Sequence, residues 1–265
     1  MPRIAIGQYY PAGSPIHNLD PRLKLICSFS FIVMLFFITS ALGYAVAACF
    51  IAMCVKVSTV PFRFILRSLR AIFILLLFTV SLNMFFMPGY DLVFRLGFIT
   101  IYMEGIVRAA MMGARLVLLI FSSSILTLTT PPIELTGAIE FVLTPLKKIR
   151  VPAAEIAMMM TIALRFIPTL VEEMDKIMKA QKARGADFET GGIIKKAKSL
   201  IPLLIPLFIS AFRRADELAM AMEARCYRPD APRTRMKTHR LAQRDFVALG
   251  VTALFFGTVL ITRMI

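Results

Sequence analysis

Four long stretches of this sequence contain no charged side chain: Leu25–Val55, Ala71–Tyr90, Leu116–Ile133 and Phe246–Thr262. A bilayer core of roughly 30 Å needs about 20 apolar residues in a helix that rises ~1.5 Å per residue. Hydrophobic residues make up 58% of the chain, above the proportion of about half that is usual in soluble domains. These features predict an all-α integral membrane protein with about five transmembrane helices.

The first stretch, Leu25–Val55, has 31 residues and is too long for one straight span. A straight helix of that length would measure about 46 Å, against a bilayer core of roughly 30 Å. Residues 39–44 (Thr-Ser-Ala-Leu-Gly-Tyr) offer a turn near the middle. We therefore expect two short helices in a hairpin, with Lys24 and Lys56 snorkelling back to the same side. A single tilted helix is the alternative.

The distribution of basic residues predicts the orientation in the membrane. Lys56, Arg63, Arg67 and Arg70 form a short basic loop without an acidic residue, which the positive-inside rule places in the cytoplasm. A third span then leaves the cytoplasm and a fourth, Ile106–Thr130, returns to it. Five spans that start inside put the N-terminus in the cytoplasm and the C-terminus outside.

Between the fourth and the last span lies a long basic segment with apolar residues at helical spacing, which we expect to be cytoplasmic. The predicted organisation is a membrane region over residues 1–130, a cytoplasmic domain of long amphipathic helices over residues 131–245, and a last transmembrane helix over residues 246–265. The uncharged stretch Ser199–Ala211 contains Pro202 and Pro206 and is short for a span. A membrane-surface or buried helix is the favoured interpretation, and a sixth span is the alternative.

The cytoplasmic segment contains the same short pattern twice. Residues 175–185 read DKIMKAQKARG, and residues 216–226, 41 positions later, read DELAMAMEARC. Helical spacing puts an apolar residue, an alanine and an arginine of each copy on one face. These are Ile177, Ala180 and Arg184 in the first copy and Leu218, Ala221 and Arg225 in the second. Two similar helix ends predict docking into two similar sites, hence a dimeric or pseudo-dimeric partner, although a basic residue in the last helical turn is also favoured by the helix dipole.

The end of each copy resembles the paired Ala-Arg-Gly signatures of T components in energy-coupling factor (ECF) transporters. The matching residues are Ala183, Arg184 and Gly185 in one copy and Ala224, Arg225 and Cys226 in the other. The resemblance continues through residues 128–135 (LTTPPIEL), 162–170 (IALRFIPTL) and 211–216 (AFRRAD), and residues 13–22 (GSPIHNLDPR) are similar to the family's opening. Cys226 departs from the glycine of the pattern, which puts the cap of that helix end in question.

The resemblance implies a complex at the cell membrane of two ATP-binding-cassette ATPases, forming a homodimer or a heterodimer, with this coupling subunit and a small membrane S component that captures a vitamin or a related micronutrient. In such a complex the arginine-tipped helices lie in grooves on the two ATPases. The chain itself would be no enzyme and would need no cofactor or metal.

Two further arginines, Arg108 and Arg115, lie seven residues apart in the fourth predicted span and share one helical face. Arginine inside a membrane is costly and often functional, so we expect a contact with the S component, with snorkelling as the alternative.

Other functions fit the sequence less well. The chain contains no G-x-x-x-x-G-K-[ST] phosphate loop, and its two histidines, His17 and His239, lie in no catalytic motif. The net charge of +15 comes from residues that flank apolar stretches, which argues against a nucleic-acid partner. A stand-alone secondary permease with a cytoplasmic regulatory helix domain remains the alternative, although polar residues within the spans are sparse.

Overall fold

The computed structural model describes residues 9–86, 91–96, 99–188, 192–228 and 242–264. Within them the chain divides into two compact units, which are described separately. One unit is Met1–Val142 with His239–Ile265, and the other is Leu143–Thr238.

The first unit begins with the predicted helical hairpin. Helix α1 covers Pro21–Phe37 and α2 covers Ala41–Ser58, so the 31-residue uncharged stretch does divide in two. The carboxylate of Asp20 caps α1 by accepting from the Arg22 N–H, and the Ser40 hydroxyl caps α2 by accepting from the Gly43 N–H. Side-chain caps of this kind fix where a helix starts, because they satisfy backbone donors that have no partner within the helix.

Helix α3, Phe62–Phe86, begins nine residues before the predicted span. It consists of two parts, Phe62–Arg70 and Ile72–Phe85, which meet at an angle of 61°. The basic residues Arg63 and Arg67 therefore lie on a helix, and the prediction of a loop there is wrong. The reason is the apolar residues between them, because Ile65 is fully buried and anchors the first part of the helix.

A short antiparallel hairpin follows, with β1 at Leu92–Leu96 and β2 at Ile99–Tyr102. It is an addition to the predicted all-helical architecture. Helix α4, Met103–Thr129, then leads to α5, Pro132–Leu143, and the last helix of this unit is α8, Gln243–Met264.

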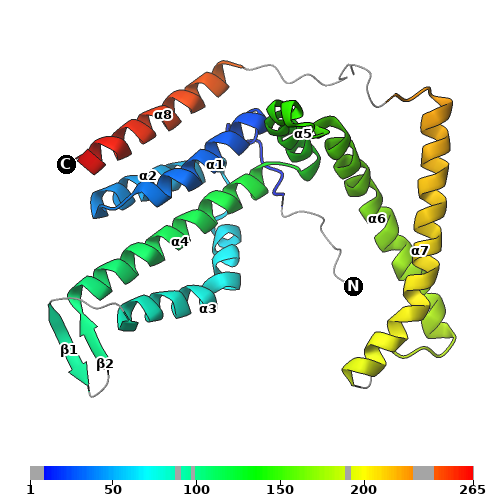
Figure 1. Cartoon of the computed structure of the whole chain (residues 1–265), viewed down its shortest axis with the longest axis horizontal. Coiled ribbons are helices and arrows are strands. Elements are labelled where there is room, and N and C mark those ends of the chain that lie inside the picture. The colour runs from blue at the N-terminus through cyan, green and yellow to red at the C-terminus, as the bar shows by residue number, and fades with distance from the viewer. Residues whose placement is uncertain (1–8, 87–90, 97–98, 189–191, 229–241, 265) are drawn as a thin grey trace. The chain divides into compact units, whose positions relative to one another are not determined.

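The core of the first unit lies among α1, α2, α4 and α8, and Figure 1 shows these four helices side by side. Its buried side chains include Phe31 and Leu35 of α1, Ile51 of α2, Leu118 of α4 and Phe255 of α8. The rings of Phe50 and Phe255 stack with their centroids 4.5 Å apart.

The second unit contains a 3₁₀ helix η1, Thr144–Ile149, and two long helices, α6 (Ala153–Ala183) and α7 (Ile193–Ala224). The uncharged stretch Ser199–Ala211 lies inside α7, and both of its prolines are within the helix.

The described part of the chain has four helices that are long and apolar enough to cross a membrane, namely α2, α4, α6 and α8, and the two parts of α3 count as a fifth if they form one span. The predicted class, an all-α integral membrane protein with about five spans, is confirmed. Helix α6 was not among the predicted spans, and α7 does not pass the same test. Helix α1 has 17 residues and is short for a span.

Candidate functional site

Helix α6 ends in a capped turn at Arg184. The N–H of Gly185 donates to the Lys182 carbonyl over 3.0 Å. The N–H of Ala186 donates to the Gln181 carbonyl, also over 3.0 Å. These two bonds form a Schellman cap, in which the residue after the helix is left-handed. Gly185 has a φ of +87°, which a glycine adopts without a steric penalty.

Helix α7 ends in the same way at Arg225. The N–H of Cys226 donates to the Glu223 carbonyl over 2.8 Å. The N–H of Tyr227 donates to the Met222 carbonyl over 3.0 Å. Cys226 itself is left-handed, with a φ of +57°, although it carries a Cβ. The cap that the cysteine put in question is therefore present, and both sequence repeats end in one backbone geometry.

All six residues of the two predicted tips are exposed: Ala183, Arg184, Gly185, Ala224, Arg225 and Cys226. Neither arginine makes an ion pair with another residue in the part of the chain that the structure describes. On the predicted faces, Ala180 and Ala221 are exposed, whereas Ile177 and Leu218 are partly buried. Each tip therefore presents small side chains and a guanidinium that can make several directed hydrogen bonds with a partner.

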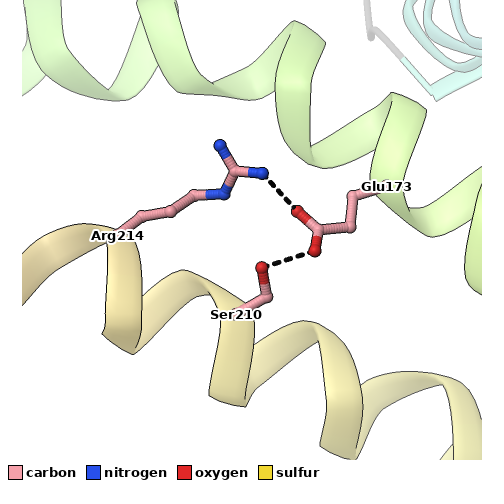
Figure 2. Close-up of polar contacts among 3 residues, drawn as sticks. All are labelled: Glu173, Ser210 and Arg214. Atoms are coloured by element: carbon pink, nitrogen blue, oxygen red, sulfur yellow. Dashed lines mark hydrogen bonds and ion pairs between the residues drawn. The ribbon is translucent and has the colours of Figure 1, made fainter. Parts of the chain in front are cut away.

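Helices α6 and α7 cross, so that their C-terminal ends lie at opposite ends of the pair (Figure 1). At the crossing, Arg214 Nη2 donates to Glu173 Oε2 over 2.8 Å, and the Ser210 hydroxyl donates to the other oxygen of the same carboxylate (Figure 2). Glu173 and Arg214 are 41 positions apart, the same separation as the two repeats. The two helices therefore cross at equivalent positions, two residues before each repeat. Each arginine tip lies 11 residues, or about 16 Å of helix, from the crossing.

Between this crossing and its N-terminus, α7 carries an exposed apolar surface. Its residues recur at spacings of three and four, as on one side of a helix. They are Leu200, Ile201, Leu204, Ile205, Phe208, Ile209 and Phe212. A contiguous apolar surface of this kind usually contacts a membrane or another protein.

The structure gives different surroundings to the two arginines of α4. Arg115 donates from Nε to the Tyr44 hydroxyl over 3.0 Å and from Nη2 to the Ile38 carbonyl over 3.3 Å. Its guanidinium also lies 5.6 Å from the centre of the Phe36 ring. It thus holds the turn between α1 and α2, whereas Arg108 is exposed.

A second polar cluster, which sequence reasoning missed, surrounds Lys24. The Lys24 ammonium donates to the carbonyl oxygens of His17 and Thr129, over 3.0 and 3.1 Å, and the residue is buried. The prediction that Lys24 snorkels to the surface is therefore wrong, because carbonyl oxygens replace water around its charge. The Asp20 N–H donates to Asp245 Oδ1 over 3.0 Å and ties α8 to the start of α1.

His17 belongs to the same cluster. Its Nε2 lies 2.9 Å from the Tyr10 carbonyl, which can only accept, so Nε2 carries the proton and Nδ1 accepts from the Ser14 hydroxyl over 2.6 Å. Burial lowers the pKa of His17 from 6.5, and the nearby Lys24 charge lowers it further, whereas the hydrogen bond to Tyr10 acts in the opposite direction. The only sequence signal for this cluster is residues 13–22, the opening segment of the resemblance.

Among the described residues, no group of three or more His, Cys, Asp or Glu side chains is placed to hold a metal ion. Sequence comparisons place the chain in a known family. The family model for cobalt transport proteins, CbiQ, matches residues 12–238.

Three relatives bear the name energy-coupling factor transporter transmembrane protein EcfT. The protein of Clostridium kluyveri is 57% identical, over 92% of this chain and 91% of its own length. That of Ruminiclostridium cellulolyticum is 51% identical, over 99% and 98% respectively. That of Thermosediminibacter oceani is 49% identical over the full length of both chains.

Proposed function

The chain belongs to the family of transmembrane T components of energy-coupling factor transporters, and from this premise we propose that it couples two ATP-binding-cassette ATPase subunits to a substrate-binding S component. The substrate would be a vitamin or a related micronutrient. ATP hydrolysis would take place in the partners, and this chain would transmit the resulting movement.

The observation that carries the proposal is the pair of equivalent helix tips. Arg184 and Arg225 lie at the ends of two helices with the same cap, and both guanidinium groups are exposed. Two identical or closely related ATPases would offer two similar grooves, one for each tip. The alanines beside each arginine would allow close approach, and the guanidinium would make the directed contacts.

The crossing of α6 and α7 supports transmission between the two tips. The contact of Glu173 with Ser210 and Arg214 joins the two helices at equivalent positions. Movement of one tip relative to the other would change the crossing angle and shift the apolar surface of α7. We assign that surface to the S component, together with the exposed Arg108 of α4.

We further propose that the N-terminus and the domain of residues 131–245 are cytoplasmic, because ATP is available on that side. The chain as a whole is a multi-pass membrane protein.

The test is substrate uptake measured beside co-purification of the ATPases. Arg184→Ala or Arg225→Ala alone should weaken the complex or uncouple it, since losing one partner of a buried charged contact costs about 2–5 kcal/mol. The double variant should stop uptake. Substrate capture by the isolated S component should not change, and Arg108→Leu should reduce co-purification of the S component alone.

The matched control is Lys179→Ala combined with Arg213→Ala. It removes one exposed cation from each of the same helices, five residues before Arg184 on α6 and 12 residues before Arg225 on α7. Full uptake in the double tip variant, or equal loss in this control, would mean that the two arginines are ordinary surface charges.

A further inference from the structure

Helices α1, α2, α4 and α8 leave an apolar cavity of about 470 Å³ between them, here called the slot. Its wall includes side chains from all four helices, among them Phe31, Ile51, Cys54, Ile125 and Val251. The polar Ser28 and Ser122 of the wall are directed at each other, with their hydroxyl oxygens 3.3 Å apart. The slot therefore offers little to a polar solute and much to a hydrocarbon chain.

The slot runs along the helices and has two different ends. On α8 its wall extends from Arg244 to Thr252, and on α1 from Leu23 to Phe31, so it follows each helix for eight residues or about 12 Å. One end is where α1 and α8 begin and α4 finishes, as Figure 1 shows, and it contains Lys24, Thr129 and Arg244. The other end is apolar and lies deeper in the bundle.

Among the residues that the structure describes, the charges at the polar end leave one cation available to a ligand. Lys24 is buried and donates to two carbonyl oxygens. The Asp245 carboxylate accepts from the backbone N–H groups of Asp20 and Ala242, over 3.0 and 2.8 Å. Arg244 is exposed and pairs with no acidic residue in the part of the chain that the structure describes. A ligand that fits both ends has an anionic group attached to a long apolar chain.

We propose that the slot binds one acyl chain of an anionic phospholipid and that Arg244 pairs with the phosphate of the same molecule. Phospholipids surround the helices of a membrane protein at high concentration, so a chain of this chemistry is always available to fill the slot. The polar end lies where α8 enters the membrane, at the depth of lipid headgroups. Basic pockets between transmembrane helices bind anionic headgroups at this depth.

The experiment uses the full chain, with any subunits that co-purify, in vesicles containing phosphatidylglycerol or phosphatidylcholine with a photoreactive acyl chain. Cross-linked peptides are identified by mass spectrometry. We expect labelling of slot residues on α2 and α8, with phosphatidylglycerol about fivefold more effective, as one charge contact at a membrane surface provides. Arg244→Gln should remove this preference, and Arg63→Gln, which neutralises an exposed cation outside the slot, should keep it.

A second pair of variants tests the slot itself. Ala248→Phe places a ring in the slot and should abolish its labelling by both lipids, with Thr252→Leu as the milder variant if the first does not fold. Leu249→Phe adds a ring to the exposed side of the same helix and should change nothing. Undiminished labelling after Ala248→Phe in a folded protein, or equal labelling by the two lipids in the unmodified chain, would overturn the proposal.

Discussion

Gly185 and Cys226 occupy the same position after their helices, and both are left-handed. A Cβ at Gly185 would meet no other atom within 4 Å, so only the backbone conformation opposes a larger residue there. We predict that Gly185→Ala lowers the free energy of unfolding by about 1 kcal/mol, the usual cost of a left-handed residue with a Cβ. Cys226→Ala should cost little, since that position already carries a Cβ.

The control for this pair is Gly13→Ala. Gly13 also has open space around its Cβ position, but its backbone is not left-handed, so alanine fits it without that strain. The melting temperature, followed with a fluorogenic thiol reagent, should fall by a few degrees for Gly185→Ala alone. An equal change in Gly13→Ala would mean that the left-handed cap is not responsible.

His17 predicts a dependence of stability on pH. Because its pKa is lowered in the folded protein, the contribution of the neutral ring is present above about pH 6.5 and is lost as the pH falls through the folded pKa. The melting temperature should therefore drop between pH 7 and pH 5. His17→Gln cannot be protonated in this range and should give a flatter profile. Parallel profiles for the two proteins would exclude His17 as the titrating group.

At the scale of elements, the contact between Glu173 and Arg214 predicts the outcome of a charge reversal. Glu173→Arg or Arg214→Glu alone places like charges at the crossing of α6 and α7 and should lower both melting temperature and uptake. The double reversal restores opposite charges and should recover more than about half of each loss, because contacting residues are energetically coupled. Recovery should stay incomplete, since Ser210 has no carboxylate at position 173 to donate to.

The control reversal is Lys179→Glu, an exposed change on α6 six residues from Glu173. It should leave the crossing intact. If the double reversal is no better than the worse single variant, the pair does not hold the helices together.

An element can be predicted from the sequence when residues close to it along the chain determine where it begins, ends or bends. The hairpin of α1 and α2 follows from the length of Leu25–Val55 and from a capping serine within it. The bend in α3 does not, because no proline or glycine marks it. The hairpin of β1 and β2 was missed because its strands are only five and four residues long, although a glycine, Gly97, lies between them in the sequence.

Features that depend on neighbouring residues could be predicted, whereas those that depend on contacts between distant residues could not. The two helix ends could be predicted because the repeat of residues 175–185 and 216–226 is visible in the sequence, and because their caps involve only neighbouring residues. The burial of Lys24 depends on the Thr129 carbonyl, 105 positions away. The contact between Glu173 and Arg214 depends on where two helices cross, although its separation of 41 residues equals that of the two repeats and is a signal for it in the sequence.

For the whole molecule, the main question about topology is whether α6 crosses the membrane. Its length and composition permit this. Its flanking charges argue against it, because basic residues lie at both ends. Lys147, Lys148 and Arg150 precede the helix, and Lys179, Lys182 and Arg184 lie at its C-terminal end. Under the positive-inside rule both ends then belong on the cytoplasmic side, with the helix at or below the membrane surface.

The side on which the C-terminus lies tests this arrangement. With the hairpin of α1 and α2 counted as two short spans, and α3, α4 and α8 as the other three, a tag after Ile265 should be reached by an impermeant protease added outside intact cells. Cys226 should react with an impermeant thiol reagent only after the cytoplasmic face is opened, with bound ATPases removed so that they do not shield it. Cys226→Ser controls for reaction at the three other cysteines. If α6 also crosses, the number of spans becomes even, and the tag is protected in intact cells. That result would contradict the cytoplasmic placement of residues 131–245, because both arginine tips would then lie outside, on the side opposite the ATPases.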